Sequence, residues 1–125
     1  MDGRRFEELV AEALDGLPAE FQEHLENVEV IVEDWPSIDD LESVGLERHE
    51  RFELLGLYIG VPLTERGSNY FGVLPDRIAL YRRSIELYTG EDPEAIREEV
   101  RRTVIHEIGH YYGISDERLE EMGWG

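Results

Sequence analysis

The chain has 125 residues, no cysteine, and a formal net charge of −18 that arises from 30 acidic and 12 basic residues. This length suits a single domain over residues 1–125, and a hydrophobic share of 41% is enough for a packed core. The lack of cysteine excludes disulfides, thiolate metal sites and a cysteine nucleophile, and the acidic charge argues against binding to nucleic acids or anionic membranes.

The N-terminal segment, residues 1–21, is acidic and amphipathic and lacks the apolar stretch of a signal peptide. No apolar run reaches the roughly 18 residues that a membrane-spanning helix needs. We therefore expect a soluble, cytoplasmic protein.

The first part of the chain, residues 6–34, predicts two helices followed by a strand. Apolar residues between Phe6 and Leu17 recur at spacings of three and one, which is the stripe of an amphipathic helix. Pro18 fits the first turn of a second, short helix. The alternating valines of residues 28–34 then predict a strand with one apolar face.

The middle of the chain predicts the strands that complete a small sheet. Its expected elements are a weak helix at 37–46, a polar and mobile segment at 47–53, a strand at 54–63, a loop at 64–72, and a third strand around Ile78 to Tyr81 within residues 74–88. Strands in the middle and helices at both ends indicate an α+β fold with a mixed or antiparallel sheet of about three strands.

A long helix follows, with clear signals at both of its ends. Asp92 is its candidate N-cap and Pro93 occupies its first position. The helix should run to about Tyr112 and stop at Gly113, and a short final helix should cover residues 116–122.

Three ionisable residues of this helix, in the motif H-E-I-G-H at residues 106–110, lie at or inside its apolar sector. His106 and His110 are at the edge of the sector and Glu107 projects inside it. Ionisable side chains are rarely buried unless they are paired or functional, so their position predicts a functional site. The apolar sector itself contains Ile96, Val100, Val104, Ile108 and Tyr111.

The spacing of the histidines predicts a metal site. Residues four apart lie above one another on a helix, so the imidazoles of His106 and His110 can converge on one cation. Gly113 lets the chain leave the helix and fold back, which would bring Asp116 to the same ion. Three protein ligands leave a fourth position for water, as in catalytic zinc sites. If Asp116 only caps the final helix, Glu120 is the substitute ligand.

The remaining candidate residues have simpler interpretations. His106 and His110 could instead be core-edge histidines paired with carboxylates. His24 and His49 lie in polar segments, so we expect them to be solvated. Met122 is expected to be core or surface filler. The adjacent residues Tyr111 and Tyr112 are expected to be one core residue and one partly exposed residue.

With these residues the chain resembles the small bacterial zincin-like metallopeptidases, also called minimal metalloproteases, whose motif here reads HExxHxxGxxD. The resemblance implies a compact zincin-type domain that binds one zinc ion through His106, His110 and Asp116, with Glu107 as the catalytic base. The resemblance covers nearly the whole chain and is most specific at residues 100–121. Its other landmark segments are residues 6–18, 28–34, 54–67 and 74–83.

The expected activity is zinc-dependent hydrolysis of peptide bonds by a metal-activated water, with short or unfolded peptides as substrates. An extended substrate should pair with a sheet edge, for which Arg77 to Arg83 is the best candidate. Two alternatives stay open: a non-catalytic or structural metal domain, and another metal-dependent hydrolase of the endoribonuclease type. The latter enzymes lack a glutamate equivalent to Glu107, and an acidic chain binds RNA poorly.

Overall fold

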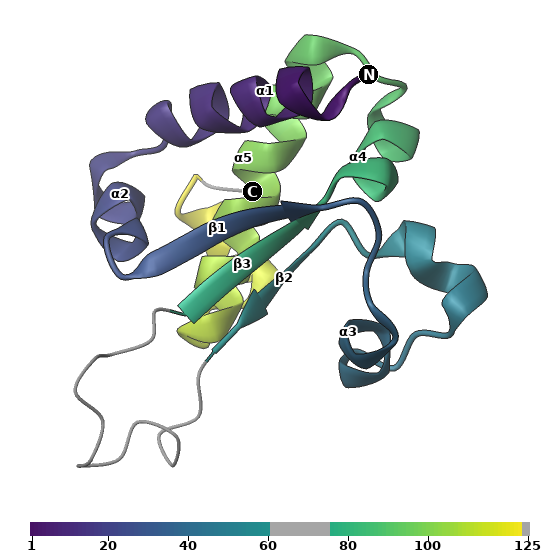
Figure 1. Cartoon of the computed structure of the whole chain (residues 1–125). Helices are drawn as coiled ribbons and strands as arrows, with labels where there is room; N and C mark the ends of the chain where they lie inside the picture. Colours follow the sequence, from purple (N-terminus) through teal and green to yellow (C-terminus); the bar gives the residue numbers. More distant parts are fainter. Residues whose placement is uncertain (61–75, 124–125) are drawn as a thin grey trace, which may run out of the picture.

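A computed structural model of the chain describes residues 1–60 and 76–123. A three-stranded sheet packs against a long C-terminal helix, and shorter helices surround them (Figure 1). The architecture confirms the α+β class. The predicted loop at 64–72 and the end of the predicted strand at 54–63 lie outside the described residues. The elements in chain order are α1 (Gly3–Asp15), α2 (Ala19–Leu25), β1 (Val28–Glu33), α3 (Ile38–Ser43), the 3₁₀ helix η1 (Arg48–Glu53), β2 (Gly56–Ile59), β3 (Asp76–Tyr81), α4 (Arg82–Thr89), α5 (Pro93–Tyr111) and α6 (Asp116–Glu121).

The sheet is mixed, with strand order β1-β3-β2. On one side, β3 pairs in parallel with β1, so that Ile78 lies opposite Val30. On the other side it pairs antiparallel with β2, where Ile78 lies opposite Tyr58. β3 is therefore the central strand, and its residues other than Arg77 are buried.

The prediction of a free sheet edge at Arg77 to Arg83 is therefore wrong. The first part of this range lies in the central strand, and Arg82 and Arg83 begin α4, a helix that the sequence pattern did not indicate. The apolar run of β3 is typical of a strand buried on both faces, but a run of this kind does not identify its neighbours. Both partners come from earlier parts of the chain, so only the tertiary structure determines which strand is central.

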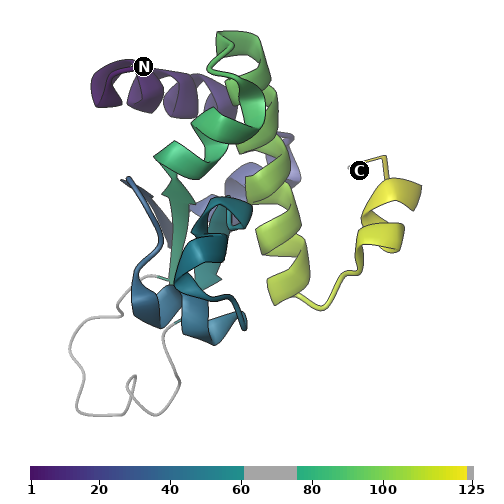
Figure 2. The same cartoon turned by 90° about the vertical axis from the view of Figure 1, so that its right-hand side faces the viewer.

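The main core lies between α1, α5 and the sheet. Figure 2 shows α5 between the sheet on one side and α6 on the other. The apolar stripe predicted for the first helix is confirmed, because it is buried against α5 and the sheet. The buried cluster contains Phe6, Leu9, Val10, Ala13, Leu17, Phe21, Ile78, Leu80, Ile85, Ile96, Val100, Val104, Ile105, Ile108 and Leu119.

Helix α5 begins as the sequence predicts. The side chain of Asp92 accepts a hydrogen bond from the Ala95 N–H at 2.9 Å, and Pro93 occupies the first turn. Ile105 joins the buried face. Tyr111, which was predicted to belong to this face, is 50% exposed and lies outside the core. None of the helices in residues 1–60 and 76–123 is long and apolar enough to cross a bilayer.

The segment predicted to be polar and mobile forms η1 instead. A capping box orders its start, because the side chain of Glu50 accepts a hydrogen bond from the Glu47 N–H at 3.0 Å. Ser84 of α4 donates its hydroxyl hydrogen to the Arg51 carbonyl at 3.0 Å, which joins η1 to α4. Polar composition therefore did not prevent this segment from folding onto its neighbour.

Gly56 allows β2 to lie directly on α5. An added β-carbon at this position would be 2.5 Å from Thr103 Cγ2 and 3.1 Å from the carbonyl oxygen of Ala79. Both distances are shorter than carbon atoms normally tolerate. The strand and the helix can therefore approach this closely only because residue 56 has no side chain.

We predict that Gly56→Ala destabilises the protein by about 1–3 kcal/mol, the usual cost of overpacking a filled core. Thr103→Ser removes the Cγ2 methyl group and should recover part of this loss in the double variant, while the contact with Ala79 remains. Urea unfolding of the wild type, both single variants and the double variant measures the coupling. Simple additivity of the two single changes would contradict the proposed contact.

Candidate metal centre

Two imidazoles lie one turn apart near the C-terminal end of α5. The ring centroids of His106 and His110 are 6.1 Å apart, and the rings are inclined at 64°. This arrangement follows from the spacing of four residues on a helix. The histidines therefore lie together on one edge of α5, as the sequence predicts.

The chain reverses its direction immediately after this helix. Gly113 has a φ of +77°, a left-handed conformation that glycine adopts without strain. Its N–H donates to the His110 carbonyl at 3.0 Å, and the N–H of Ile114 donates to the Gly109 carbonyl at 2.8 Å. This pair of bonds is a Schellman motif, which ends the helix and directs the chain toward α6.

Helix α6 then packs back onto α5. Leu119 of α6 is fully buried, and a β-carbon added at Gly109 would lie 2.9 Å from its Cδ1 atom. Ser115 directly precedes α6, and its side chain accepts a hydrogen bond from the Arg118 N–H at 3.2 Å. Ser115 is thus the N-cap, so the alternative in which Asp116 caps this helix is wrong.

Asp116 is instead directed at the two histidines. Its Oδ1 atom is 2.7 Å from His110 Nε2 and 3.3 Å from His106 Nδ1. One potential ligand atom from each of the three residues lies within 4.8 Å of the others. The structure therefore brings together the three side chains that the sequence singled out. It also brings together Glu47, His49 and Glu50, but the two glutamates form the capping box of η1.

The donor set fits a metal ion. Within the described residues, His106 Nε2 is buried and has no hydrogen-bond partner. The other ring nitrogen, Nδ1, faces Asp116 at 3.3 Å, and an imidazole can bind a metal ion through either nitrogen. Two imidazoles and one carboxylate are also the ligand types that zinc accepts.

The protonation states favour ligation as well. Burial lowers the pKa of His106, and the negative charge of Asp116 opposes this effect only in part. The hydrogen bond with His110 lowers the pKa of Asp116. Since metals bind neutral imidazole and ionised carboxylate, both shifts keep these side chains in the forms that a cation needs.

Glu107 lies beside this cluster but is held by a different element. Its Oε1 atom accepts a hydrogen bond from the backbone N–H of Tyr58 in β2 at 2.9 Å. Its Oε2 atom is 3.7 Å from His110 Nδ1, and its side chain is 20% exposed. Burial raises the pKa of Glu107, against the effects of the Tyr58 N–H and His110. The contact between Glu107 and Tyr58 joins residues 49 positions apart and was not predicted from the sequence.

A cleft of about 330 Å³ adjoins the three residues of the H-E-x-x-H motif. One wall is residues 53–56, from the end of η1 to the start of β2, and Tyr88 of α4 contributes to the lining. The other wall is the face of α5 from Glu99 to His110. A hollow of this size beside convergent polar groups is a typical ligand-binding site.

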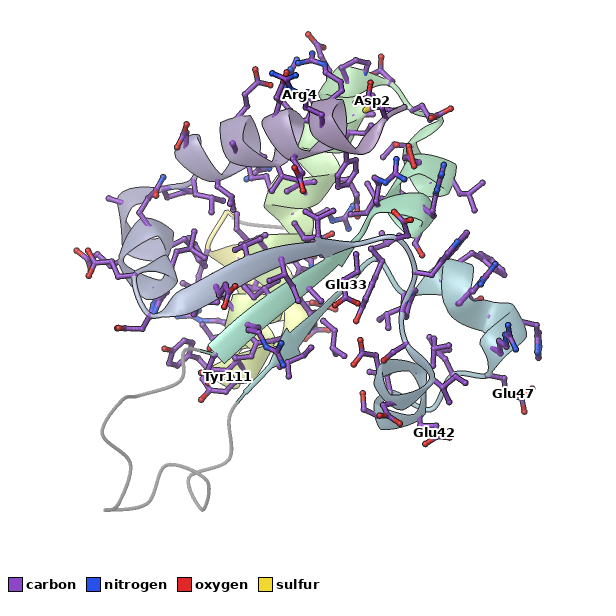
Figure 3. The ribbon with its side chains drawn as sticks, in the orientation of Figure 1. Asp2, Arg4, Glu33, Glu42, Glu47 and Tyr111 are labelled. Atoms are coloured by element: carbon purple, nitrogen blue, oxygen red, sulfur yellow. The ribbon has the colours of Figure 1, made fainter. Side chains whose placement is uncertain are left out.

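The other aromatic and histidine residues that the sequence analysis considered lie outside this cleft. His24 and His49 are exposed, as predicted, although the His24 ring also lies 4.7 Å from the Tyr112 ring. Tyr111 stacks on Tyr58 with centroids 4.1 Å apart, near the ends of β2 and β3 (Figure 3). Tyr111 and Tyr112 are 50% and 55% exposed, so the prediction that one of them belongs to the core is wrong.

Comparison with known proteins agrees with this geometry. No curated protein matches the chain. A family model described as zincin-like metallopeptidase matches residues 25–124, from the end of α2 to beyond α6. Since this match covers most of the chain and includes every residue of the candidate centre, the protein belongs to the zincin-like metallopeptidase family.

Proposed function

We propose that this protein is a zinc-dependent peptidase that holds one zinc ion through His106, His110 and Asp116. The observation that carries the proposal is the convergence of these three side chains to within 4.8 Å at their ligand atoms. The family match supports metal-dependent peptide hydrolysis. Glu107 belongs to the same cleft but accepts its hydrogen bond from β2, which suits a catalytic rather than a ligating role.

In this proposal the protein positions and moves one proton. A bound zinc ion lowers the pKa of water toward neutrality and polarises a carbonyl group. Glu107 accepts the proton of the attacking water on Oε2, because Oε1 already accepts the Tyr58 N–H. The same carboxyl group then donates this proton to the leaving amine of the cleaved peptide.

The substrate we propose is a short or unfolded peptide that extends along β2 rather than β3. The N–H of Tyr81 donates to the carbonyl of Leu55 at 3.0 Å, so alternate residues of β2 from Leu55 onward face β3. Gly56 and Tyr58 direct their backbone groups to the opposite side, where Glu107 lies. Apart from the Tyr58 N–H, which already donates to Glu107, the backbone groups of these two residues point away from β3 and suit β-augmentation.

Two alternatives predicted from the sequence are less well supported. An endoribonuclease role is disfavoured by the family match and by the net charge of −18. A non-catalytic metal domain needs the same three ligands, but it gives no reason for the position of Glu107 in the cleft. Metal removal and substitution of Glu107 distinguish this second alternative from a peptidase.

The variant Glu107→Gln should retain zinc and lose hydrolysis by about 10²- to 10⁴-fold, the usual contribution of a general base. Hydrolysis of an unstructured, internally quenched peptide measures turnover, and mass spectrometry measures the zinc content. Glu94→Gln is the matched control, because Glu94 lies exposed in the first turn of the same helix. Full activity of the Glu107 variant in a pure preparation would falsify its role as the base.

The third ligand can be identified by comparing two substitutions on α6. Asp116→Asn should weaken zinc binding by at least the 10- to 100-fold that loss of an outer-shell partner costs. Glu120→Gln, the substitute predicted from the sequence, should leave zinc affinity unchanged. Competition with a fluorescent chelator measures both affinities, and the reverse order of effects would assign the ligand to Glu120.

Removal of zinc by a chelator should abolish hydrolysis and leave the fold in place. The core of α1, α5 and β3 does not include the proposed ligands, so the far-ultraviolet circular dichroism spectrum should be retained. Added zinc should restore the activity. A cooperative loss of helical signal on chelation would instead indicate a structural metal.

A further inference from the structure

The cleft beside the proposed metal centre continues along α5 away from the histidines. It reaches back from His106 to Glu99, which is seven residues earlier on the same face. At about 1.5 Å of rise per residue, these positions lie roughly 10 Å apart along the helix axis. A peptide bond at the metal would therefore place one long, extended side chain of the substrate in reach of Glu99.

The carboxylate of Glu99 lacks a strong partner. Thr103 donates its hydroxyl hydrogen to Glu99 Oε1 at 3.4 Å, which is a long hydrogen bond. In the described part of the chain, no arginine lies within ion-pair distance of this carboxylate; Arg102 influences it only at longer range. Burial raises the pKa of Glu99, and the charge of Arg102 and the Thr103 hydroxyl oppose this effect only in part. A cation entering the cleft would provide that compensation.

The walls of the cleft suit a side chain with an apolar stem. Leu54 and Leu55 line it on one side, and the exposed ring of Tyr88 lines it from α4. Lysine and arginine bury their methylene groups on such surfaces and keep the charged end beside a carboxylate. The Tyr88 ring can also stack on a guanidinium group.

The net charge of the whole chain also favours cationic substrates. Its net charge is −18, and the exposed carboxylates of Asp2, Glu42 and Glu47 project from separate parts of the chain (Figure 3). A field of this sign attracts cationic peptides and repels anionic ones. The cleft and the overall surface therefore favour the same class of substrate.

We infer that Glu99 makes this protein selective for peptides with a lysine or arginine side chain close to the scissile bond. The inference rests on the proposed peptidase function, because the metal centre defines where that bond lies. Glu99 is a specificity-determining residue in this scheme and takes no part in proton transfer.

Binding tests the inference without turnover. Fluorescein-labelled, unstructured peptides that differ only by lysine or norleucine at one scanned position are titrated onto Glu107→Gln in buffer containing zinc. At the best position the lysine peptide should bind about five- to tenfold more tightly, the effect of one charged contact in a partly exposed site. Adding Glu99→Gln should remove this difference and leave the affinity for the norleucine peptide unchanged. Adding Glu94→Gln, the control on the same helix, should preserve the difference.

Three results would overturn the inference: equal affinities for the two peptides, a lysine preference that survives Glu99→Gln, and tighter binding of a matched glutamate peptide, which would assign selectivity to Arg102.

The ratio of kcat/KM for the same peptides, measured with the active protein, separates this inference from the proposed function. Hydrolysis with equal kcat/KM values would overturn the selectivity alone. A lysine preference in binding without any hydrolysis would support the role of Glu99 and count against the peptidase.

Discussion

The reversal of the chain at the end of α5 returns the carboxylate of Asp116 to His106 and His110. A helix can align two imidazoles by itself, but the third group that faces both of them comes from outside α5. The left-handed turn at Gly113 redirects the chain, and Leu119 then occupies the space beside Gly109 that a side chain would fill. Packing of α6 on α5 therefore positions the acid that completes the donor set.

The two carboxylates of the site have opposite environments. Glu107 is largely buried beneath β2, and its pKa is raised by the loss of solvent around its charge. Asp116 is exposed, and its pKa is lowered by its hydrogen bond with His110. Chemically similar groups whose pKa values are shifted in opposite directions commonly have different roles. This difference agrees with a proton-accepting role for Glu107 and a ligating role for Asp116.

Strand β2 connects the sheet to this chemistry. One of its edges pairs with β3, and the N–H of Tyr58 on the other edge holds Glu107. The close approach of strand and helix depends on Gly56, where a β-carbon would collide with Thr103. The same short strand therefore completes the sheet, orients the proposed base and contributes to the wall of the cleft.

The sequence by itself determined the features that depend on neighbours along the chain. The helical spacing of His106 and His110, the cap at Asp92 and the turn at Gly113 all follow from local geometry, and each appears in the structure as expected. Asp116 was also anticipated as the candidate third ligand, although the sequence left open whether this residue only caps α6 and Glu120 takes its place. That choice depends on which side chain the packing of α6 directs toward the histidines.

Only the tertiary structure decided how segments distant in sequence meet. Hydrophobic patterning identifies a buried strand but contains no information about its neighbours, so the central position of β3 was not predictable. The contact between Tyr58 and Glu107 and the cleft that extends to Glu99 depend on the same pairing. Local sequence therefore determined the groups that could hold a metal and the candidate base Glu107. Long-range packing determined the contact that orients Glu107, the free edge of β2 and the cleft around them.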